Sequence, residues 1–130
     1  ARLTMEDETL LTLLDQWENV YKKGLLTFWL LLLLCERPMY VFEMGEALTD
    51  ASQGSITADE KSLYRALRRF EATGLVQSTW HRSELGPRRR YYQLTELGLE
   101  LLHRFVQRNI LIFQEPAVAR RLALSLQNTN

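Results

Sequence analysis

The sequence is poor in cysteine, proline and histidine, with one, three and two residues of each kind among 130. A single cysteine excludes a disulfide scaffold and is in keeping with a reducing cytoplasm. The position of Cys35 inside an apolar run predicts a buried, protonated and inert thiol. The few cysteines and histidines show no zinc-ligand spacing, so we expect neither a metal centre nor a cofactor.

Long apolar runs are also absent. The longest, from Leu25 to Cys35, spans 11 residues and contains Thr27, whereas a membrane-crossing helix needs about 20. The first residues lack a basic stretch followed by an apolar one, so we expect no secretory signal. Hydrophobic residues make up 46% and charged residues 25% of the chain, the balance of a globular domain. The sequence predicts one cytoplasmic domain over residues 1–130, without a membrane partner.

The net charge is zero, but the two signs are separated along the chain. Residues 61–90 carry eight basic side chains against Glu71 and Glu84, a net charge of +6. Residues 1–21 carry Arg2 against five acidic side chains, a net charge of −4. A concentrated basic segment gives a neutral chain one positive face, which favours a polyanionic partner.

Apolar periodicity and turn residues predict the order of the elements. Gly24 is expected to separate two N-terminal helices, Thr57 to cap the fourth helix, and Pro116 to interrupt the last long one. The expected helices lie at residues 5–23, 25–36, 42–48, 57–73, 96–116 and 117–126, and the strands at 75–80 and 88–94, with the basic wing at 80–92. Three helices before a hairpin predict a winged helix-turn-helix, mainly α with a small β-hairpin, with additional helices at both ends.

The helix that begins at Thr57 has an apolar face of Leu63, Leu67 and Phe70. Its opposite face, roughly 140–160° away on the helical wheel, and its edges carry the side chains expected to contact DNA. These are Lys61, Ser62, Tyr64, Arg65, Arg68 and Arg69. Such a helix suits the major groove, where arginine and lysine reach guanine edges or phosphates. A merely solvated basic face is an equally weighted alternative for this helix by itself.

The hairpin adds a second basic element directly after this helix. Its expected contacts to phosphates or to a minor groove come from His81, Arg82, Arg88, Arg89 and Arg90. Neighbouring strand residues point to opposite faces, so at least one of the three successive arginines points outward beside the helix. The alternative is a charged edge strand that only prevents aggregation. Two adjacent basic elements, helix then wing, favour DNA binding.

Three segments carry a family resemblance: residues 22–43, residues 61–76, and residues 86–98, which read GPRRRYYQLTELG. In this order they resemble the PadR family of bacterial transcriptional regulators. The chain departs from the family at Val41 and at Lys61, where glycine is common. The resemblance implies sequence-specific binding of double-stranded promoter DNA by a homodimeric repressor in the bacterial cytoplasm, at the nucleoid. The acidic N-terminal helix and short C-terminal part are also similar to those of a cyanobacterial circadian-clock modifier.

The resemblance further implies a dimer built from the end helices. Residues 5–23 would form the N-terminal helix, 24–95 the DNA-binding core, and 96–127 the dimerisation region. Apolar side chains expected between the two copies are Leu10, Leu14, Trp17, Leu102, Phe105, Ile112 and Phe113. The alternative is that the end helices pack on each other within one chain. Trp17 and Trp29 could line an effector pocket of the kind some family members have, but the effector is unknown.

Two other classes of function are alternatives. A winged helix can serve as a protein–protein interaction module without specific DNA binding, and zero net charge is compatible with that role. An enzyme is disfavoured, because His81 and His103 lie away from the cysteine and from clustered acids, and the sequence has no phosphate loop or nucleophile elbow. We therefore expect no catalytic residues.

Overall fold

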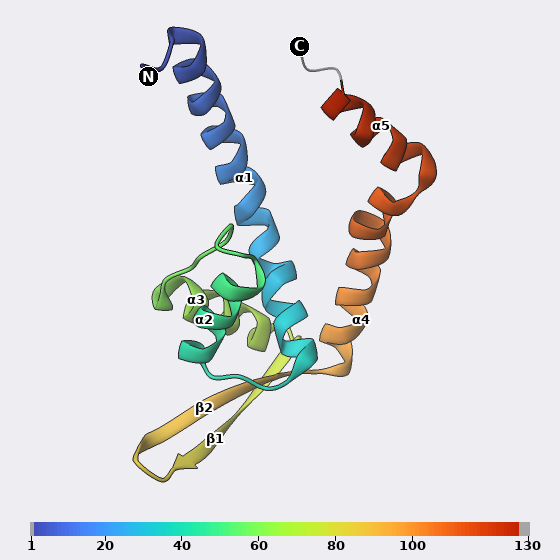
Figure 1. Ribbon diagram of the computed structural model, residues 1–130. Helices are drawn as coiled ribbons and strands as arrows, with labels where there is room; N and C mark the ends of the chain where they lie inside the picture. The colour runs from blue at the N-terminus through green and yellow to red at the C-terminus, as the bar shows by residue number, and fades with distance from the viewer. Residues whose placement is uncertain (1, 128–130) are drawn as a thin grey trace.

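The computed structural model describes residues 2–127, and it confirms the winged-helix fold, mainly α with a small β-hairpin (Figure 1). The elements are α1 (Met5–Glu36), α2 (Val41–Ala51), α3 (Glu60–Ala72), β1 (Val76–Ser83), β2 (Gly86–Leu94), α4 (Glu96–Phe105) and α5 (Pro116–Gln127). A π-helix (Val106–Ile110) and a 3-10 helix (Leu111–Gln114) join α4 to α5. The hairpin is the wing of the fold, and it projects away from the N-terminal end of α1 (Figure 1).

Helix α1 is continuous over 32 residues, so the predicted break at Gly24 is wrong. Gly24 does not adopt the left-handed conformation of a helix end, and its position opens on free space. A glycine inside a helix costs only about 1 kcal/mol, and the leucine-rich turns that follow outweigh this cost by packing into the core. Thr4 caps the helix, accepting from the Asp7 amide at 3.0 Å.

The C-terminal half of α1 lies at the centre of the core, as predicted for this apolar segment. Its buried leucines pack with side chains from α2, α3 and β2. The largest fully buried side chains are Leu30, Met39, Met44, Leu48, Leu63 and Leu67. Cys35, by contrast, is exposed, so its predicted burial is wrong. The apolar run extends one residue beyond the buried stripe of the helix, and Cys35 falls on the solvent side.

The recognition-type helix α3 begins at Glu60 with Asp59 as its cap, which corrects the expected cap at Thr57. The Asp59 carboxylate accepts from the Ser62 amide at 2.8 Å. Upstream, Ser52 Oγ accepts from the Ile56 amide at 3.1 Å and donates to the Ile56 carbonyl at 3.0 Å. This local closure holds buried Ile56 against the core and leaves the next residues as an extended lead into the helix. As predicted, Gly74, in the left-handed region at φ 80°, closes α3.

The two strands of the wing are longer than predicted, because they extend through the expected turn to leave a short tip at Glu84 and Leu85. They pair antiparallel, with Trp80 opposite Arg90 and His81 opposite Arg89, and the register is irregular between His81 and Ser83. At the base, Met39 exchanges backbone hydrogen bonds with Tyr92 at 3.1 and 2.9 Å. This bridge fixes the wing to the segment between α1 and α2.

Helix α4 starts at the predicted cap, Thr95, whose hydroxyl accepts from the Gly98 amide at 3.1 Å and donates to the Gly74 carbonyl at 2.6 Å. Gly98 is buried against the backbone of Leu75. The contact brings the end of α3, the base of the wing and the start of α4 together at one point.

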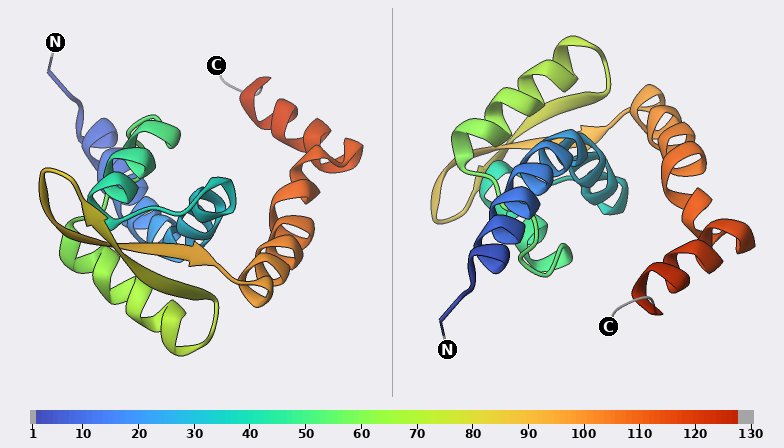
Figure 2. Two further views of the ribbon diagram at one scale, coloured as in Figure 1. Left: turned by 90° about the horizontal axis from the view of Figure 1, so that it is seen from below. Right: turned by 90° about the horizontal axis from the view of Figure 1, so that it is seen from above.

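The long C-terminal helix bends earlier than expected, in the π and 3-10 turns that precede Pro116. The N-terminal half of α1 and α5 lie apart as two arms (Figures 1 and 2). Leu102 is 3% exposed, and Phe105 stacks on Phe28 at 5.5 Å. Both side chains take part in the packing of α4 on α1, so the expected exposure of Leu102 is wrong, whereas Phe105 is half-buried and its place between two copies stays a prediction. No helix within residues 2–127 has the length and apolarity to cross a membrane.

Candidate nucleic-acid interface

The outward face of α3 is basic, as the helical wheel predicts. Lys61, Tyr64, Arg65, Arg68 and Arg69 are all exposed, and Ser62 is half-buried. The opposite face buries Leu63, Leu67 and Phe70 in the core, so packing fixes the direction in which the basic side chains point. The hydrogen bond from the Ser62 amide lowers the pKa of Asp59, with Arg65 and Lys61 adding to this effect.

The wing has two faces with different partners. On the face toward α3 (the helix-side face) lie Ser78, Trp80, Arg88, Arg90 and Tyr92, and on the other (the outer face) Thr79, His81, Arg89 and Tyr91. The alternation follows from the two-residue period of a strand. The three consecutive arginines therefore do not act as one cluster: the middle one is directed away from the other two.

Arg90 is tied to α3. Its Nη2 donates to Glu71 Oε1 at 2.9 Å, and its Nε donates to Ser78 Oγ at 2.9 Å. Its guanidinium also lies over the rings of Trp80 and Tyr92, at 5.9 and 5.3 Å from their centroids. Burial raises the pKa of Tyr92, whereas the neighbouring positive charge of Arg90 opposes this rise. Arg90 is thus half-buried, with most of its hydrogen-bonding capacity directed within the chain.

Arg89 is held on the outer face by aromatic rings. Its guanidinium lies over Tyr40 at 4.6 Å, and the Tyr40 and Tyr91 rings meet edge to face at 5.4 Å. His81 contacts Tyr91 at 5.0 Å and hydrogen-bonds Thr79 through Nε2 at 2.9 Å. A groove of about 660 Å³ runs along this face, with Arg37 and Arg82 at its edges.

The structure brings Arg68 of α3 near the wing's helix-side face, because Arg68 and Arg90 both lie close enough to Tyr92 to lower its pKa. Arg82 and Arg88 are exposed near the wing tip. The partners that position the wing arginines were not predicted from the sequence: they are Tyr40, Glu71, Ser78 and Trp80. Strand alternation could have placed Ser78 and Trp80 beside Arg90, but no pattern in the sequence identifies Tyr40 as the partner of Arg89.

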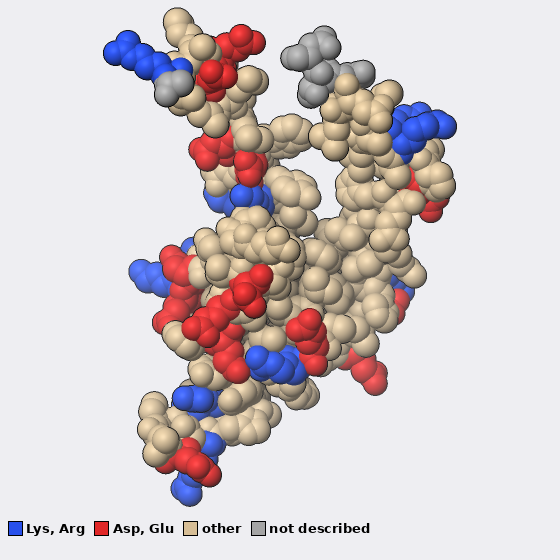
Figure 3. Space-filling model, viewed as in Figure 1, with Lys and Arg blue, Asp and Glu red and all other residues tan. Residues whose placement is uncertain are grey.

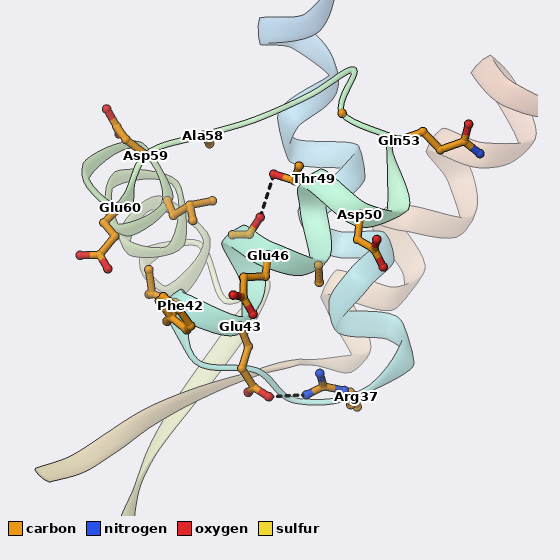
Figure 4. Close-up of a pocket in the computed structure, with 15 residues that line it drawn as sticks. Arg37, Phe42, Glu43, Glu46, Thr49, Asp50, Gln53, Ala58, Asp59 and Glu60 are labelled. Carbon is orange, nitrogen blue, oxygen red and sulfur yellow. Dashed lines mark hydrogen bonds and ion pairs between the residues drawn. The ribbon is translucent and has the colours of Figure 1, made fainter. Parts of the chain in front are cut away.

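An acidic hollow borders the basic surface. It measures about 1210 Å³ and lies between α2 and the start of α3 (Figure 4). Its acidic side chains are Glu43, Glu46, Asp50, Asp59 and Glu60. Arg37 pairs with Glu43 at 3.2 Å. Figure 3 shows acidic side chains over this side of the molecule and basic ones on the wing. The carboxylates of this hollow disfavour phosphates, in contrast to the basic side chains on the outward face of α3 and the wing.

Comparisons with known proteins agree with this geometry. Residues 30–104 match the family model described as "Transcriptional regulator PadR-like family". A PadR-like transcriptional regulator from Bacillus cereus is 28% identical, with a TM-score of 0.61 over 83% of this chain and 96% of that one. Bacillus subtilis PadR, solved in complex with operator DNA, is 18% identical, with a TM-score of 0.61 over 65% of this chain and 48% of that one, and shows the fold alone. An uncharacterized Lysinibacillus sphaericus protein is 26% identical over 65% of this chain and 78% of its own length.

Proposed function

This chain belongs to the PadR-like family of transcriptional regulators, and we propose that it binds double-stranded operator DNA as a repressor. The observation that carries the proposal is the continuity of two basic elements, the outward face of α3 and the wing. Two features support the proposal: the packing of α3 on the core leaves its arginines exposed, and exposed Arg88 shares Trp80 with Arg90, which bonds Glu71 of α3.

In the proposed complex, α3 enters the major groove. Lys61, Arg65 and Arg68 reach base edges and phosphates, and Ser62, Tyr64 and Arg69 contact the backbone at its flanks. Arg82 and Arg88 near the wing tip meet the adjacent phosphates or minor groove, with His81 and Arg89 behind them. Repression then follows from occupation of a promoter. No step requires a catalytic residue.

We expect fluorescence-anisotropy titrations to show tight binding to one fragment upstream of the protein's own gene or its neighbours. A scrambled duplex of equal length is the control. Each phosphate neutralised by lysine or arginine contributes a slope of about −0.9 to log K against log salt concentration. Five or so contacts from α3 and the wing therefore predict a slope of about −4 to −5 for the operator.

Weak binding to every fragment at low salt, or an affinity that does not change with salt, would contradict the proposal. Either result would favour the alternative of a protein-interaction module. A further search would then start from the acidic hollow, where Phe42 is 58% exposed beside carboxylates.

We further propose that the protein acts as a homodimer through its two arms. Support comes from apolar side chains that the isolated chain leaves in solvent. Leu10, Leu14 and Trp17 on α1 are 58, 49 and 73% exposed, and Ile112 and Phe113 before α5 are 45 and 50% exposed. Exposed apolar side chains gathered on two arms in this way are typical of surfaces that a partner covers. A two-fold axis between the arms would set two recognition helices about 34 Å apart, one DNA turn.

Trp17→Asp is expected to convert the dimer into a monomer in sedimentation equilibrium at micromolar concentration, because it places a charge in the apolar interface. Leu85→Asp is the matched control: Leu85 is 99% exposed at the wing tip, so its replacement should leave the mass unchanged. A Trp17→Asp protein with the mass of the wild type would contradict an interface through α1.

A further inference from the structure

The recognition helix and the wing are joined by an acidic side chain. Glu71, near the end of α3, accepts from Ser78 of β1 at 2.7 Å through Oε2, and from Arg90 of β2 at 2.9 Å through Oε1. Arg90 Nε donates to Ser78 Oγ at 2.9 Å. The three side chains therefore close a ring of hydrogen bonds between α3 and both strands. We refer to this ring as the brace.

The charge of Glu71 is unfavourable for DNA binding by itself. It is one of two carboxylates among residues 61–90, a segment that otherwise carries only positive charge. A carboxylate beside the DNA surface repels phosphates and lowers the local positive potential. Glu71 can offset this loss of DNA affinity only by holding its partners, Arg90 and Ser78, in positions that favour DNA binding.

Arg90 connects Glu71 to the side chains farther along the wing. Trp80 contacts the guanidinium groups of both Arg88 and Arg90, each 5.9 Å from its ring centroid. Tyr92, 3% exposed, supports Arg90 from the core at 5.3 Å. The order from the helix outward is thus Glu71, Arg90, Trp80 and Arg88, and Arg88 is the exposed one of the two arginines.

We propose that Glu71 is a positioning residue for DNA binding: by holding Arg90 and Ser78 it sets the angle of the wing to α3. The wing and α3 then reach neighbouring grooves of one operator at the same time. Arg90 accordingly acts inside the protein, and Arg88 beyond it contacts the DNA. This inference rests on the DNA binding proposed above, and it assigns a role to Glu71, a carboxylate of α3 that bonds both strands of the wing.

The test compares Glu71→Ala with Glu46→Ala. Both remove one carboxylate from a helix, but Glu46 lies in the acidic hollow, away from the wing. Without the brace, Glu71→Ala should bind the operator about fivefold more weakly, although its net charge is more favourable. Its binding to the scrambled duplex should stay the same or tighten. Glu46→Ala should leave the ratio of operator to scrambled affinity unchanged, and both variants should melt like the wild type.

A second measurement tests the brace without DNA. In free Glu71→Ala, NMR order parameters of backbone amides in residues 78–90 should fall, and in Glu46→Ala they should not. The charge swap E71R/R90E has the net charge of the wild type and should recover part of the operator preference lost in R90E. The inference would be overturned if Glu71→Ala had the same wing order parameters and the same ratio of operator to scrambled affinity as Glu46→Ala. A wild-type protein that does not distinguish operator from scrambled duplex would instead overturn the proposed function, whatever the order parameters show.

Discussion

Arg65→Ala combined with Arg68→Ala is expected to weaken operator binding about 100-fold, because a good arginine contact to a base contributes about 1–3 kcal/mol. Both side chains are exposed on the outward face of α3, and neither forms an ion pair within residues 2–127. Their loss should therefore leave the melting temperature unchanged. Anisotropy titration against the operator and the scrambled duplex measures the effect.

The matched control is Arg104→Ala combined with Arg120→Ala, which removes the same two charges from α4 and α5. These arginines are also exposed but belong to α4 and α5, outside α3 and the wing, and Arg104 pairs only with the exposed Glu100 at 2.9 Å. We expect the control to lose less than threefold in affinity, through the general field alone. If the two double variants lost the same operator affinity, overall charge would govern binding, and specific contacts by α3 would not.

Gly98→Ala is expected to lower the free energy of unfolding by about 3 kcal/mol, because the added methyl group has no room. A Cβ at this position would overlap the carbonyl oxygen of Leu75 and lie 2.8 Å from Cδ1 of Leu94. The carbonyl belongs to the backbone at the base of the wing and also accepts from Thr95. It cannot move without disturbing the start of α4. Urea unfolding followed by circular dichroism measures the change.

Gly24→Ala is the natural control for this substitution. Gly24 is also helical, but its Cβ would meet nothing within 4 Å. Alanine should therefore stabilise the protein by up to about 1 kcal/mol, through helix propensity alone. If Gly98→Ala were neutral or stabilising too, α4 would not pack as closely on the base of the wing as the structure indicates.

The sequence predicts those features of the fold that depend on repetition. Helical periodicity located the core face of α3, the density of apolar residues located the buried half of α1, and Thr95 and Gly74 marked real helix ends. The helix break predicted at Gly24 was wrong because a glycine can either end a helix or be tolerated inside one. Which of the two occurs depends on the tertiary contacts of the leucines that follow. Cys35 misled because an apolar run does not reveal which of its residues falls on the solvent side.

The basic face of the candidate site was predictable for the same reason, since a helical wheel requires only the spacing of charges. What could not be predicted is how each wing arginine is used. Arg89 turns to Tyr40 and Arg90 to Glu71, and both partners lie far from them in the sequence. Such pairings depend on how the hairpin packs against α2 and α3, which no local pattern records.

Because α1 is one unbroken helix, the direction in which the side chains of the N-terminal arm point is fixed relative to the core by the number of residues between them. With each residue turning the helix by about 100°, one residue inserted near Gly24 would rotate Leu14 and Trp17 by that angle about the helix axis. Seven inserted residues, nearly two full turns, would restore their direction to within about 20° while lengthening the arm by about 10 Å. The number of residues between Trp17 and Leu30 thus determines where the arm's apolar stripe points relative to α3. A substitution near Gly24 that preserves the helix leaves this direction unchanged, whereas an inserted or deleted residue does not.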